Sequence, residues 1–264
     1  MQRRAFASSI IAVAGALVFT GSALPQVIDI NDAINKAGRQ RMLSQRMAKS
    51  YMAIGQGVQG KDADKILSAS MALFDRQLVE LKTFSPTPEI RATYDLLEGL
   101  WRDYKTALVG SAVGNTGAEQ VLSIAGKVLQ LAHQGTLQLK SVSGKPLGRL
   151  VNIAGRQRML SQRMAAFYLS ASWGVQAAAS TTEVTKAKDE FLKAHELLKN
   201  APESSAAIQA ELLLAETQFT FFAAALRDLR PGAGEMSAQN NVFTTSERIL
   251  QVMDGVTGMY SKLV

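Results

Sequence analysis

A twelve-residue string that occurs twice constrains this chain more than any other feature. The string Ala-Gly-Arg-Gln-Arg-Met-Leu-Ser-Gln-Arg-Met-Ala occupies residues 37–48 and, unchanged, residues 154–165 of the 264. The offset between the copies is 117 residues, and the flanking Asn35 is matched at that offset by Asn152. Protein cores tolerate exchanges among similar hydrophobic residues. An unchanged run that holds three arginines and two glutamines therefore indicates chemistry rather than core filling.

The spacing of apolar residues predicts an all-α chain. Apolar residues recur at intervals of three and four, strand-like alternation is scarce, and glycine and proline cluster at a few sites. We expect helices over residues 29–57, 62–84, 88–113, 116–141, 149–178, 182–199, 203–229 and 235–262. Four helices in each half of the chain, joined by short turns, predict two tandem antiparallel four-helix bundles.

The two halves are expected to correspond without an insertion or deletion. At the offset of 117, Phe74 maps onto Phe191, Leu97 onto Leu214 and Gly117 onto Gly234. The predicted domains are a first bundle over residues 24–142, a hinge over 143–148 and a second bundle over 149–264. Because four antiparallel helices end near the level where the first began, the short hinge places the two motif helices parallel and side by side, about a pseudo-two-fold axis.

The first 23 residues have the pattern of an export signal. Arg3 and Arg4 precede the apolar run 10–19, and the small residues 21–23 form a cleavage site. We therefore expect a periplasmic protein with a removed leader. The alternative is an uncleaved membrane anchor, although the apolar run is short for a spanning helix.

The distribution of charge argues against nucleic acid as a partner. The formal net charge is +7, with 29 basic and 22 acidic side chains. Without the two arginines of the leader and the six of the repeated string, the remaining 21 basic residues balance the 22 acidic ones. Positive charge on two short segments is too small a footprint for a phosphate backbone, but it suits a small anion.

Metal, cofactor and enzyme chemistry find little support in the residue inventory. The chain has no cysteine, and its two histidines, His133 and His195, do not fall at equivalent positions of the repeat. We expect both histidines to be structural. No set of nucleophile, base and orienting residue stands out, so we predict a binding protein without a cofactor.

Helical geometry separates the three arginines of each string. At 100° per residue, Arg41 lies within about 60° of Ala37, Gly38, Gln45 and Ala48, which makes a stripe of small residues around one arginine. The second copy repeats the stripe around Arg158 with Ala154, Gly155, Gln162 and Ala165. Arg39 and Arg46 lie on another face, as do Arg156 and Arg163.

Two helices that pack through these stripes would bring Arg41 and Arg158 face to face. Two guanidinium groups in a partly dry contact repel each other and cannot lose their protons. A small planar oxyanion between them would satisfy both donor forks, and glycine at positions 38 and 155 would let the backbone approach it. We therefore assign ligand contact to Arg41, Arg158, Gly38, Gly155, Ala37 and Ala154.

The remaining polar residues of the string receive a supporting role. Support of the ligand-binding groups, or ligand contact itself, is the expected assignment for Arg39, Arg156, Arg46, Arg163, Gln45 and Gln162. For the four arginines, structural ion pairing is the other assignment. The alternative for Arg41 and Arg158 themselves is that each forms a salt bridge with a carboxylate of a neighbouring helix.

The string Asn-Lys-Ala-Gly-Arg-Gln-Arg-Met-Leu-Ser-Gln-Arg at residues 35–46 resembles the signature of the PilJ-type, or nitrate/nitrite-sensor, extracytoplasmic domain of bacterial receptors. It is similar to the "P box" of the NarX and NarQ nitrate-sensing kinases. The resemblance implies a four-helix bundle that binds nitrate between two first helices through a symmetric pair of arginines. The matching arginines are Arg41 and Arg158. This chain departs from the family layout in carrying two such domains and no kinase or methyl-accepting region.

The predicted function is periplasmic binding or sensing of nitrate or nitrite between the two motif helices. The signal would pass to a membrane-bound sensor kinase, a chemoreceptor or a transporter. The alternative is a ligand-free helical adaptor that docks on a membrane receptor or a pilus-associated component, with its arginine faces recognising an acidic surface.

Overall fold

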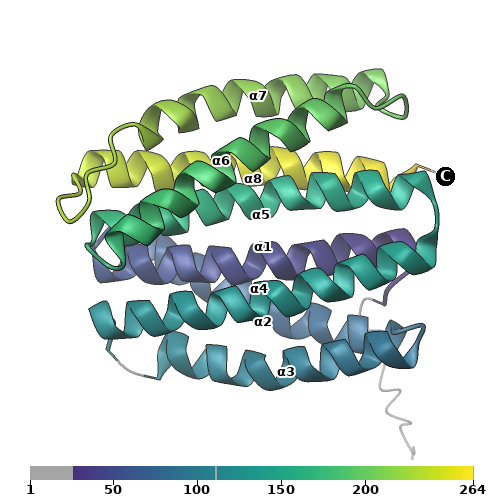
Figure 1. Cartoon of the computed structure of the whole chain (residues 1–264), viewed down its shortest axis with the longest axis horizontal. Helices are drawn as coiled ribbons and strands as arrows, with labels where there is room; N and C mark the ends of the chain where they lie inside the picture. The colour runs from purple at the N-terminus through teal and green to yellow at the C-terminus, as the bar shows by residue number, and fades with distance from the viewer. Residues whose placement is uncertain (1–25, 111, 264) are drawn as a thin grey trace, which may run out of the picture.

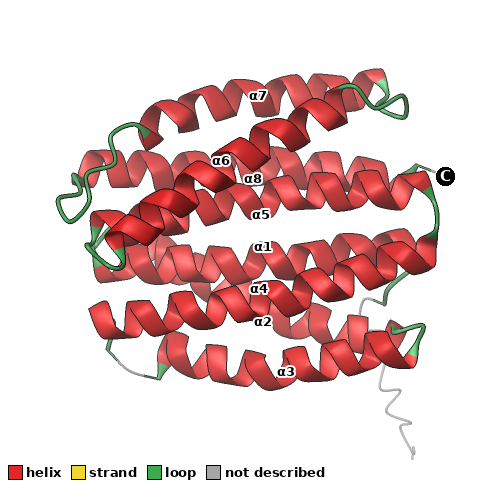
Figure 2. Ribbon diagram, in the orientation of Figure 1, coloured by secondary structure: helices red, strands yellow, loops and turns green. Residues whose placement is uncertain are grey.

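The structure of the protein is a computed structural model that describes residues 26–110 and 112–263. Within these residues the chain folds into eight α-helices and no strand. Figures 1 and 2 show how the helices are arranged. The all-α prediction is therefore confirmed. The predicted export signal over residues 1–23 lies outside the described residues.

The eight helices fall into two sets of four. The helices are α1 (Ile30–Gly55), α2 (Gly60–Phe84), α3 (Pro88–Val109), α4 (Asn115–Ser143), α5 (Pro146–Ser172), α6 (Ala177–Lys199), α7 (Ala206–Leu226) and α8 (Met236–Lys262). Only Gly144 and Lys145 separate the two sets, and Gly144 has a positive φ of 59° that ends α4. Glycine adopts this left-handed conformation without steric cost.

Local sequence signals account for several helix ends. The Asp29 carboxylate accepts a hydrogen bond from the backbone N–H of Asp32 at 2.8 Å and caps α1. Thr87 caps α3 in the same way, and Pro88 occupies the first helical position. There its missing N–H is harmless and its fixed φ fits the helix.

The motif helices α1 and α5 form the centre of the molecule. They lie side by side, with α2 and α4 against α1, α6 and α8 against α5, α3 against α4, and α7 against α8 (Figure 1). Ile34 near the start of α1 approaches Gly148 near the start of α5, and Gln56 after the end of α1 bonds to Leu169 and Ser172 near the end of α5. The two motif helices are therefore parallel, as the sequence predicts.

The expectation of a gapless repeat is wrong for the third and fourth helices. Gln45 on α1 donates to the carbonyl of Ala125 on α4, and the equivalent Gln162 on α5 donates to that of Ser246 on α8. Ala125 and Ser246 are 121 positions apart, so Gly117 does not correspond to Gly234.

The buried faces of α3 and α7 give an intermediate offset of 118. Ile90, Leu97 and Trp101 on α3 match Ile208, Ala215 and Phe219 on α7, and all six are buried. Leu97 therefore corresponds to Ala215 and not to Leu214, which is exposed. The extra residues lie in the connections, chiefly in the segment 227–235 before α8, which is longer than the segment 110–114 before α4.

Candidate functional site

The two motif helices lie in close contact at Gly38 and Gly155. A Cβ atom on Gly38 would lie 3.2 Å from Nη2 of Arg41, 3.4 Å from Nη2 of Arg158 and 3.8 Å from the Cα atom of Gly155. A Cβ atom on Gly155 would meet the same two Nη2 atoms at 3.1 and 3.5 Å. The glycines thus leave room for both guanidinium groups. We call Gly38, Arg41, Gly155 and Arg158 the arginine seam.

Each arginine of the seam reaches across to the opposite helix. Nη2 of Arg41 donates to the carbonyl of Asn152 at 3.3 Å, and Nη2 of Arg158 donates to the carbonyl of Asn35 at 3.1 Å. Both arginine side chains are fully buried. The structure therefore brings Arg41 and Arg158 together in the reciprocal arrangement that the helical stripes predict. Their contact with an anion stays a prediction.

Burial makes the positive charge of the seam costly. Desolvation, together with the charges of Arg156 and Arg158, lowers the pKa of Arg41 to about 9. Desolvation also lowers the pKa of Arg158 to about 10, against the opposing effect of Asp254. Both guanidinium groups stay protonated at neutral pH, so the seam holds two buried cations.

Two residues outside the repeated strings complete the seam: Asp254, which the sequence does not single out, and His133, which we expect from the sequence to be structural. On α8, the Asp254 carboxylate accepts hydrogen bonds from Nη1 of Arg158 and, at 2.8 Å, from Nη2 of Arg39. On α4, Nη1 of Arg41 lies 3.2 Å from Nδ1 of His133. The salt-bridge alternative therefore holds for Arg158. Among the described residues, no carboxylate lies within salt-bridge distance of Arg41.

The other arginines of the strings pair with carboxylates. Arg156 contacts Glu190 on α6, and Arg163 donates to Glu183 at 2.6 Å and to Oε1 of Gln45 at 3.2 Å. Among the described residues, the four arginines at positions 39, 41, 156 and 158 form salt bridges with two carboxylates, those of Glu190 and Asp254. The cluster around the seam therefore carries two more positive charges than negative ones.

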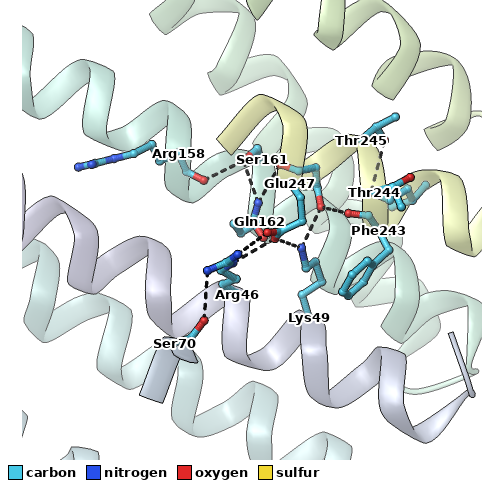
Figure 3. A network of polar contacts seen from close by, with 12 residues as sticks. Arg46, Lys49, Ser70, Arg158, Ser161, Gln162, Phe243, Thr244, Thr245 and Glu247 are labelled. Atoms are coloured by element: carbon cyan, nitrogen blue, oxygen red, sulfur yellow. Dashed lines mark hydrogen bonds and ion pairs between the residues drawn. The ribbon is translucent and has the colours of Figure 1, made fainter. Parts of the chain in front are cut away.

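A second polar cluster joins the repeats further along α1. Arg46 and the fully buried Lys49 both contact the carboxylate of Glu247 on α8 (Figure 3). Nζ of Lys49 also donates to Oγ of Ser246 at 3.0 Å and lies 4.3 Å from the centre of the Phe243 ring. Burial alone would raise the pKa of Glu247, but Lys49 and Arg46 outweigh it and lower that pKa to about 2.

The small and amide residues of the strings position the arginines. Ala37 and Ala154 are fully buried and allow the helices to come close. The carbonyl of Arg41 accepts from Oγ of Ser44, and that of Arg158 accepts from Oγ of Ser161, each at 2.8 Å. Gln45 and Gln162 donate to backbone carbonyls of α4 and α8, and Gln45 also accepts from Nη1 of Arg163.

Several polar atoms around the seam have no hydrogen-bond partner. They include Nε of Arg41, Nε of Arg158, and the side-chain oxygens of Asn35 and Asn152. A buried donor without a partner costs about 1–3 kcal/mol, and more when the group is charged. Each buried guanidinium group of the seam therefore keeps one N–H donor without an acceptor.

The described part of the chain contains no metal-binding cluster and no membrane span. No group of three or more histidine, aspartate or glutamate side chains there is arranged to hold a metal ion. None of the eight helices in Figure 2 is long and apolar enough to cross a bilayer.

Eight helices in two repeats, with buried arginines where the repeats meet, define a tandem helical-bundle protein with a cationic internal contact. The family model described as the N-terminal region of type IV pili methyl-accepting chemotaxis transducers, PilJ, matches residues 29–134 and again residues 143–254. The chain therefore belongs to the PilJ family as a tandem duplication. PilJ domains are non-catalytic sensory modules of the kind found in chemoreceptors. No curated protein and no solved structure matches the chain.

Proposed function

We propose that this protein is a non-enzymatic sensory protein that binds one small oxyanion, nitrate or nitrite, in the arginine seam. The observation that supports the proposal most strongly is the burial of Arg41 without a carboxylate partner, directly beside Arg158. A buried cation without a counter-ion is strongly destabilising. An anion that entered the seam would relieve this cost and would thereby gain affinity.

The geometry of the donors favours a planar anion. The Nη2 atoms of Arg41 and Arg158 both lie next to the glycine contact, and the Nε atoms of both side chains are unpaired. Guanidinium groups recognise planar oxyanions through two parallel N–H donors. A trigonal anion of three or four atoms fits this donor set better than a bulky phosphate, because the helices meet through glycine and alanine.

The adaptor alternative is less well supported by the same contacts. It requires that the outer arginines of the strings face an acidic partner. Arg39, Arg46, Arg156 and Arg163 instead pair with Asp254, Glu247, Glu190 and Glu183 of the chain itself. A partner surface would have to compete with these internal carboxylates.

The proposed function includes a location for the protein and a kind of partner that receives its signal. We place it outside the cytoplasm on the basis of the leader-like residues 1–23. Anion binding would change the contact between the two motif helices, and a membrane-bound sensor kinase, a chemoreceptor or a transporter would detect that change.

Isothermal titration calorimetry with sodium nitrate and sodium nitrite tests the proposal, with sodium gluconate as the control for ionic strength. We expect heat of binding from one anion per chain in the native protein and none in Arg41→Ala or Arg158→Ala, with helical circular dichroism retained. Arg41→Met keeps the side-chain volume and removes the charge, so it should fold and bind no anion. Arg76→Ala, at an exposed arginine of α2, should bind as the native protein does. Absence of heat with both anions in the native protein would refute the proposal.

A further inference from the structure

The two halves of the arginine seam are equivalent in position but not in chemistry. At the offset of 121 that relates α4 to α8, His133 of the first repeat is equivalent in position to Asp254 of the second repeat. Asp254 contacts Arg158 of its own repeat and Arg39 of the other. His133 contacts Arg41 of its own repeat. One half of the seam therefore contains a carboxylate, and the other half contains an imidazole at the same place.

Asp254 occupies the position that an external anion would take beside Arg158. Its carboxylate joins two guanidinium groups from two helices, and 42% of its side chain is exposed. It therefore lies between the buried arginine and solvent. An anion that approached Arg158 from this side would have to displace a carboxylate that is covalently tethered to the protein and present at a high effective concentration.

His133 leaves the Arg41 half without such a competitor. A guanidinium group can only donate, so Nδ1 of His133 must accept from Nη1 of Arg41, and the proton of the neutral ring is on Nε2. Burial, Arg41 and Arg156 together lower the pKa of His133 to about 4, so the ring is neutral at neutral pH. The half-buried ring lies next to the arginine that lacks a carboxylate partner.

We propose that Asp254 is a built-in counter-ion that closes the Arg158 half of the seam, and that the external monoanion binds in the Arg41 half beside His133. The inference rests on the proposed function and specifies where and how many anions bind. The anion would receive N–H donors from Arg41 and from His133, and it would reach Nη2 of Arg158 across the glycine contact. One chain would therefore bind one anion despite its two copies of the motif.

Separate substitutions of His133 on α4 and of Asp254 on α8 test this assignment. Nitrate binding by each variant is measured by calorimetry. His133→Asp gives the Arg41 half its own carboxylate, in the arrangement that Asp254 already adopts in the other half. We expect this variant to be at least as stable as the native protein and to lose nitrate binding. Asp254→Asn removes the carboxylate that closes the Arg158 half and leaves Arg158 free to donate to the same anion as Arg41, so we expect nitrate to bind at least about tenfold more tightly. Glu235→Gln removes one exposed negative charge next to α8. This control should change neither the stability of the protein nor its affinity for nitrate.

The outcomes separate this inference from the proposed function. Suppose that the native protein binds nitrate. If His133→Asp still binds nitrate, or if Asp254→Asn binds it no more tightly than the native protein does, the inference is wrong and the proposed function stands. Binding by Asp254→Asn alone refutes anion sensing by the native protein but supports Asp254 as the blocking group. If neither the native protein nor either variant binds nitrate or nitrite, both proposals are wrong. Thermal unfolding of each variant without anion shows that it is folded.

Discussion

Gly38 and Gly155 face each other where α1 and α5 meet, so closely that a Cβ atom on Gly155 would lie 3.9 Å from the Cα atom of Gly38. The two guanidinium groups of the seam lie directly beside this contact. The glycines therefore control both the separation of the motif helices and the space beside Arg41 and Arg158.

Substitution of Gly38 by alanine should impair the seam more than the fold. The new methyl group would lie 3.2 Å from Nη2 of Arg41 and 3.4 Å from Nη2 of Arg158. Overpacking costs about 1–3 kcal/mol, and the better helix propensity of alanine returns about 1 kcal/mol. We expect a small loss in urea stability and a large loss of nitrate affinity. Gly126→Ala on α4, where a Cβ atom meets nothing within 4 Å, should raise stability and leave binding unchanged. Unchanged nitrate affinity in Gly38→Ala would contradict a role of this contact in binding.

Glu247→Gln should destabilise the protein at neutral pH. The change leaves the fully buried Lys49 without its carboxylate and also unpairs Arg46. Removal of one partner from a buried ion pair costs about 3 kcal/mol or more, and urea denaturation measures the difference.

Glu98→Gln is the matched control, because it removes a carboxylate from the more exposed pair with Lys82. It should cost less than about 1 kcal/mol of stability. In the double variant Glu247→Gln with Lys49→Ala, most of the loss should be recovered, since the second repeat carries Ala166 at the position of Lys49. Equal costs at positions 98 and 247 would show that the cluster does not hold the repeats together.

Acid should remove the stabilisation that Glu247 provides. The pKa of this carboxyl group is about 2 in the folded protein, against an ordinary value of 4.5 for a glutamate in water. Because the folded-state pKa is the lower one, the stabilisation is present above about pH 4.5 and is lost as the pH falls towards about 2. The free energy of unfolding, measured by urea denaturation across this range, should fall by about 3 kcal/mol from this group. The profile of Glu247→Gln should lack this contribution. A native profile that stays flat between pH 4.5 and pH 2 would be inconsistent with it.

Nitrate affinity should rise as the pH falls from about 7 to about 5. The charged groups that act on His133 are Arg41 on α1, Arg156 on α5 and Glu190 on α6. A monoanion bound beside Arg41 would offset the two arginines and raise the pKa of His133 above its value of about 4. Binding would then take up a proton, which favours binding at low pH. Calorimetry at several pH values checks this, and His133→Gln, which cannot titrate, should show a flat profile. The prediction fails if nitrate affinity changes with pH in the same way in the native protein and in His133→Gln.

The sequence predicts the helices and the central contact well, because both follow from periodicity. The stripe of Ala37, Gly38 and Arg41 is set by the geometry of a single helix, so it could be identified without knowledge of any partner. His133 and Asp254 could not be found in this way. They lie on other helices, and their alignment depends on the lengths of the connections. The paired threonines Thr136 and Thr257, which bond to the carbonyls four residues before them, carry the offset of 121 and could have revealed the correspondence.

The two-residue connection Gly144-Lys145 makes the meeting of the motif helices an intramolecular event. In a receptor built from two separate chains, dilution dissociates such a contact, so the binding site assembles only when the protein concentration is high enough. Here the second helix stays within reach of the first at any dilution, so the site forms once for each folded chain. At a given pH, occupancy of the proposed anion site would then depend on the concentration of free anion and not on how many copies of the protein a cell makes.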